Sequence, residues 1–188
     1  MTHILSKYTD IHSHDRSQQL SGDTVVNITP GTPMLPGGTY SVGIHPWDTA
    51  AHIKLSTLKQ LVAMARDNRV VAIGEAGFDR MRGGDPACQA AVFDFQARLA
   101  RRVGKPLIIH CVRAYDMLLA AARRHCPDPG MWIVHGFRKK PELARQLLDA
   151  GIDLSMRAEH IERYPDIPRE RIHTETDAPD TSLPDIKN

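Results

Sequence analysis

The sequence has few of the features that mark secreted or membrane-embedded proteins. It contains only three cysteines, Cys88, Cys111 and Cys126, and their odd number and wide spacing exclude a disulfide framework or a zinc knuckle. No apolar run approaches the length of a membrane span, and the N-terminus lacks the hydrophobic segment of a signal peptide. We therefore expect a cytoplasmic protein without a membrane partner.

The sequence also has no large excess of charge of either sign. The chain has 24 Lys and Arg against 22 Asp and Glu, and the formal net charge of +2 is too small to attract nucleic acid by bulk electrostatics. Any nucleic-acid contact should therefore come from a local basic cluster. Low-complexity segments, internal repeats and long linkers are absent, and the hydrophobic fraction of 41% is that of an ordinary globular protein. We expect residues 1–188 to form a single domain.

Apolar runs that suit β-strands alternate with segments of helical periodicity. The predicted strands span residues 7–11, 24–28, 40–44, 70–74, 106–110, 131–135, 152–155 and 171–177. The predicted helices span residues 54–68, 87–103, 113–125, 141–150 and 158–164. Such alternation gives a parallel sheet with right-handed crossovers, and eight strands indicate an α/β fold of the (β/α)₈ TIM-barrel type. No glycine-rich dinucleotide or P-loop fingerprint follows the first strand, which disfavours an open doubly wound sheet.

Helices should be missing after the first, second and eighth strands, so that the barrel is compact. The connection from the second to the third strand contains the segment 30–38, whose prolines and glycines exclude a helix. The three strands are neighbours in a closed barrel, and their outward positions include Thr9 and Thr174, with Ile11 also outward. We expect this wall to face solvent or a thin loop rather than a large dimer interface, and hence a monomer.

Residues that bind divalent metals stand at the carboxyl ends of most predicted strands. The stretch 10–14, Asp-Ile-His-Ser-His, points two imidazoles to one face of the first strand, because residues i and i+2 of a strand share a face. Later strand ends supply His45, Glu75, His110, His135 and Asp177. The carboxyl ends of barrel strands surround the active site. Histidines needed only for packing have no reason to gather there, so the set predicts a metal centre.

The number of ligands indicates two divalent metal ions. Four histidines and two carboxylates exceed the three protein ligands of a catalytic zinc site, whereas two ions about 3.5–4 Å apart would use them all. The assignment is His12, His14 and Asp177 to one ion, His110 and His135 to the other, and Glu75 as the bridge. The expected nucleophile is a hydroxide between the ions, with Asp177 as general base. The catalytic residues are therefore predicted to be Glu75 and Asp177, and Mg²⁺, Mn²⁺ and Zn²⁺ are all compatible.

Six short motifs link these ligands to a known family. They are, in order, D-I-H-S-H, G-I-H-P-W, A-I-G-E-A-G-F-D, P-L-I-I-H-C, I-V-H-G-F and E-T-D-A-P. The series, between residues 8 and 180, resembles the TatD-related deoxyribonucleases, metal-dependent phosphodiesterases of the amidohydrolase-like barrel superfamily. The resemblance implies the same six metal ligands and hydrolysis of DNA phosphodiesters from the 3′ end. Longer relatives have a helix between the second and third strands and continue for several dozen residues after E-T-D-A-P. These differences bear on which substrate is bound and on which segments cover the barrel wall, and they leave the metal ligands unchanged.

Four further residues are candidates for contact with a phosphodiester substrate. His45 ends a strand and should line the substrate side of the site, although it also suits a role in shaping the turn at Pro46. Arg113 follows His110 closely and suits a phosphate clamp. Arg138 and Lys140 follow the sixth strand and suit phosphate binding, although such a charge run also suits a solvated face.

Two other functions compete with phosphodiester hydrolysis. The first is an amidohydrolase-type hydrolase of C–N bonds, whose metals are often bridged by a carboxylated lysine. Here the fourth strand ends in Glu75 and Lys105 precedes its strand, which disfavours that function. The second is a non-catalytic metal-stabilised scaffold or nucleic-acid adaptor. The size of the ligand set disfavours it, because structural metal sites close their coordination with four ligands.

Overall fold

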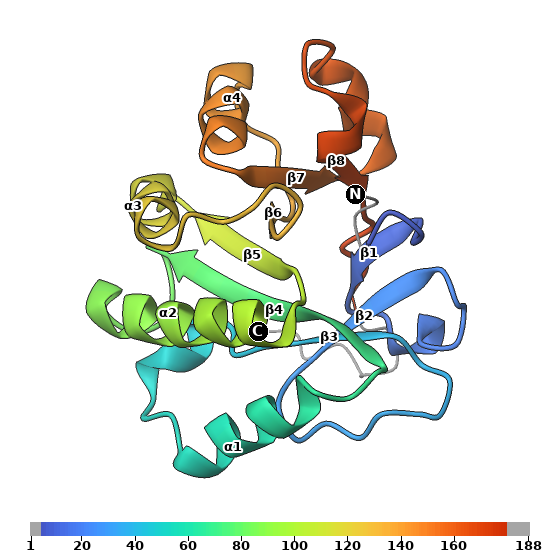
Figure 1. The fold of residues 1–188 in the computed structure, drawn as a ribbon, viewed down its shortest axis with the longest axis vertical. Coiled ribbons are helices and arrows are strands. Elements are labelled where there is room, and N and C mark those ends of the chain that lie inside the picture. The colour runs from blue at the N-terminus through green and yellow to red at the C-terminus, as the bar shows by residue number, and fades with distance from the viewer. Residues whose placement is uncertain (1–4, 180–188) are drawn as a thin grey trace.

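The computed structural model describes residues 5–179, and its centre is an eight-stranded parallel sheet curled into a nearly closed barrel (Figure 1). The strands pair in chain order and are β1 (Asp10–Ser13), β2 (Thr24–Ile28), β3 (Tyr40–Val42), β4 (Val70–Asp79), β5 (Leu107–Val112), β6 (Trp132–Val134), β7 (Ile152–Met156) and β8 (Ile172–Thr174). The α-helices are α1 (Leu55–Met64), α2 (Pro86–Val103), α3 (Tyr115–His125) and α4 (Pro141–Asp149). Four short 3-10 helices are η1 (Arg16–Gln18), η2 (Pro46–Ala50), η3 (Ala158–Arg163) and η4 (Arg169–Arg171). The (β/α)₈ prediction is confirmed.

The barrel closes where the segment after β8 meets β1. The His14 N–H donates to the carbonyl of Ala178 at 2.8 Å, and the Asp177 N–H donates to the carbonyl of His12 at 3.0 Å. Lower in the seam, the Thr174 hydroxyl donates to the carbonyl of Thr9 at 2.6 Å. These bonds bring the two ends of the described chain together, and three of the predicted ligands lie on the two sides of the seam.

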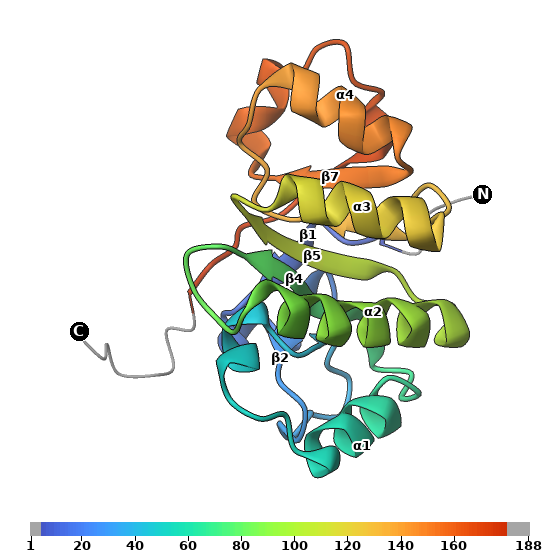
Figure 2. The same cartoon turned by 90° about the vertical axis from the view of Figure 1, so that its left-hand side faces the viewer.

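Helices α2, α3 and α4 lie along the part of the barrel wall formed by β4 to β7, whereas α1 lies at the end of the molecule near β2 and β3 (Figure 1 and Figure 2). Local sequence sets the bounds of α2. The side chain of Asp85 accepts the N–H groups of Ala87 and Cys88, and Gly104 ends the helix in the left-handed conformation at φ 66°. Side chains such as Phe93 and Leu107 then pack between helix and strand in the larger hydrophobic core. Burying each of them contributes about 1.5–3 kcal/mol.

A second, smaller core fills the lower interior of the barrel. It consists of Leu5, Tyr8, Ile11, Val25, Ala72, Ile108 and Ile133. Ile108 stands two residues before His110 on β5, and Ile133 stands two residues before His135, which directly follows β6, so both pairs point inward. The barrel is therefore packed with apolar side chains at the floor, and its polar groups are raised to the carboxyl ends of the strands.

The first strand departs from its prediction. Residues 5–7 form a turn, closed by the Tyr8 N–H donating to the Leu5 carbonyl at 3.1 Å, and β1 starts only at Asp10. The pairing of β1 with β2 shifts register between Asp10 and Ser13. Such a bulge breaks the strict alternation of faces. Ile11, expected to point outward, is consequently packed in the interior core.

Other element bounds differ less. β4 continues to Asp79 rather than ending at Gly74, and the predicted helix over 158–164 is the 3-10 helix η3. Within residues 5–179 no α-helix follows β1 or β2, as expected. The expected lack of a helix after β8 concerns residues that lie largely outside the described range. Thr9 is exposed and Thr174 is partly exposed, which confirms a wall without helical cover here.

No helix within residues 5–179 is long and apolar enough to cross a membrane.

Candidate metal centre

Glu75, on β4, is the centre of a cluster of imidazoles at the carboxyl ends of the strands. Its side chain is 3% exposed. One carboxylate oxygen, Oε1, lies 2.7 Å from His135 Nε2, 3.3 Å from His110 Nδ1 and 3.5 Å from His45 Nε2. His135 follows β6, His110 lies on β5 and His45 follows β3. Oε1 therefore faces the side of the barrel formed by these strands.

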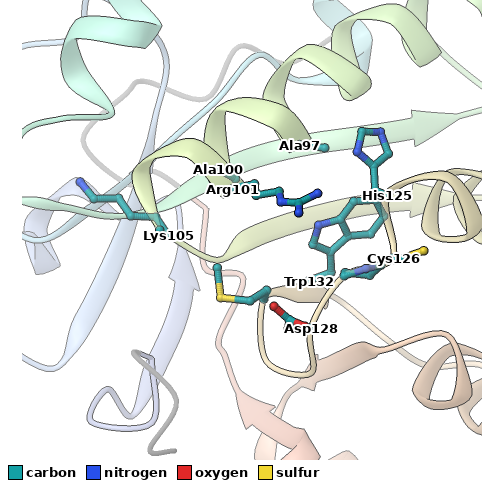
Figure 3. A pocket seen from close by; sticks show the side chains of 11 residues that line it. Ala97, Ala100, Arg101, Lys105, His125, Cys126, Asp128 and Trp132 are labelled. Atoms are coloured by element: carbon teal, nitrogen blue, oxygen red, sulfur yellow. The ribbon is translucent and has the colours of Figure 1, made fainter.

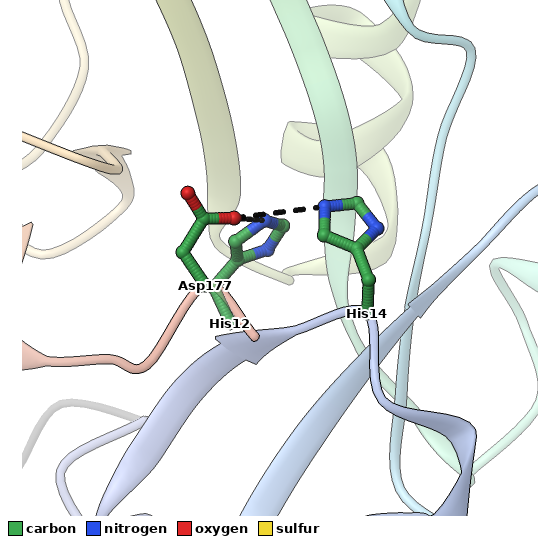
Figure 4. Close-up of side chains that lie close together, drawn as sticks. All are labelled: His12, His14 and Asp177. Atoms are coloured by element: carbon green, nitrogen blue, oxygen red, sulfur yellow. Dashed lines mark ion pairs between the residues drawn. The ribbon is translucent and has the colours of Figure 1, made fainter. Parts of the chain in front are cut away.

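The other carboxylate oxygen of Glu75 faces the barrel seam. Glu75 Oε2 lies 3.1 Å from His14 Nε2 and 3.4 Å from His12 Nε2. Asp177 closes this side, with Oδ1 at 3.7 Å from the Nε2 atom of each of these two histidines (Figure 4). Glu75 therefore stands between two sets of donors, one on each carboxylate oxygen.

Glycines let the backbones around Glu75 approach closely. A Cβ atom on Gly77 would lie 1.9 Å from the carbonyl oxygen of His110, and Gly77 has φ 155°. A Cβ on Gly74, at φ 138°, would lie 2.4 Å from the carbonyl oxygen of Ile108. Only residues without a side chain fit at these positions. The close contact of β4 with β5 is what places Glu75 beside His110.

A hydrogen-bonded chain orients His110 from behind. Asp79, at the end of β4, lies 3.0 Å from His110 Nε2 through Oδ2, and the same oxygen accepts the indole N–H of Trp47 at 2.6 Å. Burial opposes ionisation of Asp79, but the bonds from Trp47 and His110 hold its pKa below the ordinary value. An aspartate in this position fixes the ring so that the other nitrogen, Nδ1, faces Glu75.

Backbone and side-chain bonds fix the seam side. Asp10 Oδ1 accepts the N–H groups of His12 and Thr176, both at 3.1 Å, and its Oδ2 accepts the Thr176 hydroxyl at 2.6 Å. Asp177 takes the left-handed backbone conformation at φ 48°. Such a conformation costs about 1–3 kcal/mol and persists only where its surroundings impose it.

Sequence reasoning missed Glu175, which joins three strand ends. It is 4% exposed, its Oε1 accepts the Gly136 N–H at 2.5 Å, and its Oε2 accepts the hydroxyl of Ser155. The available signal was its position two residues before Asp177, which places both on the inward face. Glu175 ties the chain next to His135 to the segment that carries Asp177.

The cluster perturbs its own titratable groups. Burial opposes the charge of Glu75, but His135 and His12 hold its pKa well below the ordinary value. Burial likewise disfavours a charged His135, yet attraction to Glu75 raises its pKa to about 9. The hydrogen bond to Glu75 raises the pKa of His14. Glu75 is therefore an ionised carboxylate in a buried place, where a divalent cation would be strongly attracted.

The residues present fit divalent metal ions. Among residues 5–179, three groups have ligand atoms within 4.8 Å of one another: His12, His14 and Asp177; His12, Glu75 and His135; and His45, Glu75 and His110. Within the described range, the buried nitrogens Nδ1 and Nε2 of His12 and Nδ1 of His135 have no hydrogen-bond partner. Leaving a buried polar atom unpaired costs about 1–3 kcal/mol. Imidazole nitrogen and carboxylate oxygen together suit Zn²⁺, Mn²⁺ and other divalent ions.

The cluster opens into a hollow of about 510 Å³. It is lined by His14, Arg16, Asn27, Ile28, Thr29, Thr32, His45, Trp47, Glu75, His110, His135 and Asp177. Arg16 and Asn27 were not singled out by the sequence. Arg138 and Lys140 line neighbouring hollows on the same side of the barrel, whereas the exposed Arg113 does not line the central one.

Another hollow, of about 320 Å³, lies at the opposite, amino ends of β5 and β6 (Figure 3). It lies between the ends of α2 and α3, with Trp132 and His125 in ring contact at 5.6 Å. Lys105 lines it, and its Nζ donates to the carbonyls of Ala65 and Asp67 at 2.7 and 2.8 Å. Lys105 is thus engaged at the far end of its strand from Glu75 and does not bridge the cluster.

Comparison with known proteins gives a consistent result. A family model described as TatD related DNase matches residues 34–187. The chain is 31% identical over 157 residues to a 3′-5′ ssDNA/RNA exonuclease TatD of Klebsiella pneumoniae, with 78% of this chain and 59% of that protein aligned. It is 35% identical over 156 residues to a metal-dependent hydrolase TatD of Mycobacterium tuberculosis, with 74% and 57% aligned. The chain thus spans less than two thirds of the length of these relatives.

Solved structures of similar proteins share the fold. The TatD homologue YjjV of Escherichia coli K12 superposes with a TM-score of 0.70 at 25% identity, covering 96% of this chain and 83% of that one. A TatD family hydrolase of Entamoeba histolytica superposes with a TM-score of 0.68 at 21% identity, covering 91% and 73%. At that lower identity the likeness concerns the fold alone.

Proposed function

Because the chain belongs to the TatD-related DNase family, we propose that it is a metal-dependent hydrolase that cleaves phosphodiester bonds of single-stranded nucleic acid from the 3′ end. The observation that carries the proposal is the position of Glu75 between two sets of nitrogen and oxygen donors. A carboxylate so placed suits a bridge between two divalent ions. The relatives' names agree, since they describe metal-dependent hydrolases and exonucleases.

The proposed ligands form two sets that share Glu75. One set is His12, His14 and Asp177, and the other is His110 and His135, which both face Glu75 Oε1. His135 also lies close to His12 and so stands between the two sets. His45 Nδ1 accepts the Trp47 N–H at 3.2 Å, which leaves Nε2 as the protonated nitrogen, and the residue lines the central hollow. We therefore retain it as a contact for the substrate phosphate.

Divalent ions held there would polarise a phosphoryl oxygen and lower the pKa of water, so that hydroxide is available to attack the phosphorus at neutral pH. The chain's own residues supply the rest. Asp177 is 35% exposed and lines the hollow, so it can accept a proton from water as general base. Glu75 is buried and stays ionised, which keeps negative charge where cations are needed. Asp79 keeps His110 in one orientation.

Arg138 and Lys140 are the proposed cationic contacts for phosphate groups next to the scissile one. Both are exposed and follow the strand end that carries His135. Arg113 is left out of the proposed contacts, because its carbonyl accepts Arg80 Nη1 at 3.2 Å on the outside of the loop and its side chain does not line the central hollow.

The test is hydrolysis of 3′-labelled single-stranded DNA by the purified chain with Mg²⁺, Mn²⁺ or Zn²⁺. We expect cleavage that EDTA abolishes, and loss of about 10²–10⁴ in rate for Asp177→Asn, which removes a general base. The matched control is Asp149→Asn, an exposed carboxylate on α4. Cleavage of an amide or deaminase substrate, with none of DNA, would favour the C–N hydrolase. Absence of every activity, with metal bound, would favour the scaffold or adaptor.

A further inference from the structure

Two further hollows adjoin the hollow over the metal centre. A small one is lined by Gly136, Arg138, Met156, Arg157, His160, Glu175 and Asp177. A larger one, of about 590 Å³, is lined by Arg138, Lys139, Lys140, Pro141, Leu143, Arg163 and Tyr164. The central and small hollows share Asp177, and the small and large hollows share Arg138. The small hollow holds only about 10 Å³, so the three hollows lie side by side, from the cluster to the surface between the β6–α4 loop and η3.

The lining of these hollows changes from acidic to basic with distance from the cluster. The inner end has the carboxylates of Glu175 and Asp177. The large hollow has no lining carboxylate and four exposed cations, Arg138, Lys139, Lys140 and Arg163. Together with the exposed Arg157, which lines the small hollow, these cations are here called the basic path. Within residues 5–179 none of the five forms an ion pair, whereas Arg69, Arg80 and Arg145 do. Cations left without acidic partners suit an external polyanion.

The loop that carries three of these cations is held in place. The Tyr164 hydroxyl donates to the carbonyl of Lys139 at 2.6 Å, and the Phe137 N–H donates to the carbonyl of Ser155 at 2.9 Å. The rings of Phe137 and Tyr164 pack at 5.6 Å, and both are buried. The loop is therefore ordered before any ligand arrives, which lowers the entropic cost of binding.

We propose that the basic path binds the phosphodiester backbone of a nucleic-acid single strand whose terminal linkage lies over the metal centre. This proposal rests on the proposed function and adds the route of the strand beyond the reacting phosphate. A nucleic-acid strand carries one negative charge per nucleotide, which suits a group of cations that begins next to the centre. A single strand suits the site, because Glu75 is 3% exposed at the base of the hollow and an unpaired end can reach into it.

The test removes the two cations contributed by η3 and its start. In Arg157→Gln/Arg163→Gln, binding of a fluorescent deoxythymidylate 12-mer is measured by anisotropy at several KCl concentrations. EDTA is present, so the strand is not cut. The slope of log Kd against log salt should fall by about 1.4, since each phosphate contact to a single strand contributes about 0.7. Arg157→Lys/Arg163→Lys should keep the wild-type slope, because the charges remain.

The matched control is Arg98→Gln/Arg102→Gln, which removes the same charge from the exposed side of α2. Its slope should equal that of the wild type. A wild-type slope in both glutamine double variants would overturn the basic path. An equal decrease of the slope in both would also overturn it, because net charge alone would then explain the result. In active protein, the rise in KM for Arg157→Gln/Arg163→Gln should be larger for the 12-mer than for a dinucleotide.

The two proposals fail in different ways. If the wild type cleaves DNA but the slope is the same in every variant, the basic path is wrong and the proposed function stands. If no phosphodiester is cleaved but the slope falls only in the glutamine variant of η3, strand binding stands and hydrolysis is wrong. A 12-mer that does not bind the wild type at low salt overturns the path directly.

Discussion

At the scale of single residues, Asp79 shows how a side chain outside the ligand set shapes it. Besides His110 and Trp47, it accepts the N–H groups of Met81 and Arg82 through Oδ1, at 2.7 and 3.2 Å. One carboxylate therefore organises the chain after β4 and the orientation of an imidazole. The exposed Trp47 is in turn covered on one face by the guanidinium of Arg82 at 4.7 Å.

We expect Asp79→Asn to weaken metal binding by about 10–100-fold, because the amide no longer fixes and polarises His110. Calorimetric titration with Mn²⁺ or Zn²⁺ measures the change. The matched control is Asp94→Asn, which alters another Asp–His pair, with His125 at 2.8 Å, on the outside of the barrel. Wild-type affinity in the Asp79 variant would show that the pair is only structural.

At the scale of elements, the pairing of β4 with β5 determines whether the cluster can assemble. β4 is ten residues long, and its pairing with β5 shifts register between Ile73 and Ala76, next to Glu75. Gly77 lies opposite His110 in that pairing. Two glycines thus allow an irregular strand to approach a regular one and present Glu75 to the interior.

We expect Gly77→Ala to lower the free energy of unfolding by about 3 kcal/mol or more, since the new Cβ would meet a backbone oxygen that cannot move freely. Gly104→Ala is the control. Gly104 also has positive φ, but a Cβ there meets nothing within 4 Å, so the expected loss is only about 1–2 kcal/mol. Urea unfolding compares the two. Equal losses would mean that the backbone conformation, and not the strand contact, is what requires glycine.

At the scale of the whole molecule, the ligands come from strands spread around the barrel, so metal binding should stabilise the entire fold. His12 and His14 are at one end of the chain and Asp177 is near the other, across the seam. A ligand at 100 times its Kd stabilises a folded chain by about 2.7 kcal/mol. For a chain of this size, that corresponds to a rise in Tm of roughly 5–10 °C.

Elemental analysis after dialysis should give about two divalent ions per chain, and calorimetry should give the higher Tm, reversed by EDTA. Glu75→Gln should bind fewer ions, because the shared carboxylate is lost. His125→Ala, outside the cluster, should bind as many as the wild type. A stoichiometry of one in the wild type would contradict the bridging role of Glu75.

The sequence alone determined the alternation of strands and helices and the types of residue at the strand ends. Both follow from local patterns: hydrophobic periodicity identifies each element, and a parallel barrel brings every carboxyl end to one rim. The grouping of His12, Glu75, His110 and His135 at one rim could therefore be predicted before any interatomic distance was known.

Only the tertiary structure decided the features that depend on register and on contacts between distant segments. The bulge in β1 turned Ile11 inward, and the seam bonds placed Asp177 beside His12. Glu175 acquired its role from Gly136 and Ser155 on neighbouring strands. The basic path likewise joins the β6–α4 loop to η3, whose cations look in the sequence like an ordinary solvated surface. Their meaning comes from the hollows between them, because no local pattern encodes which loops lie side by side.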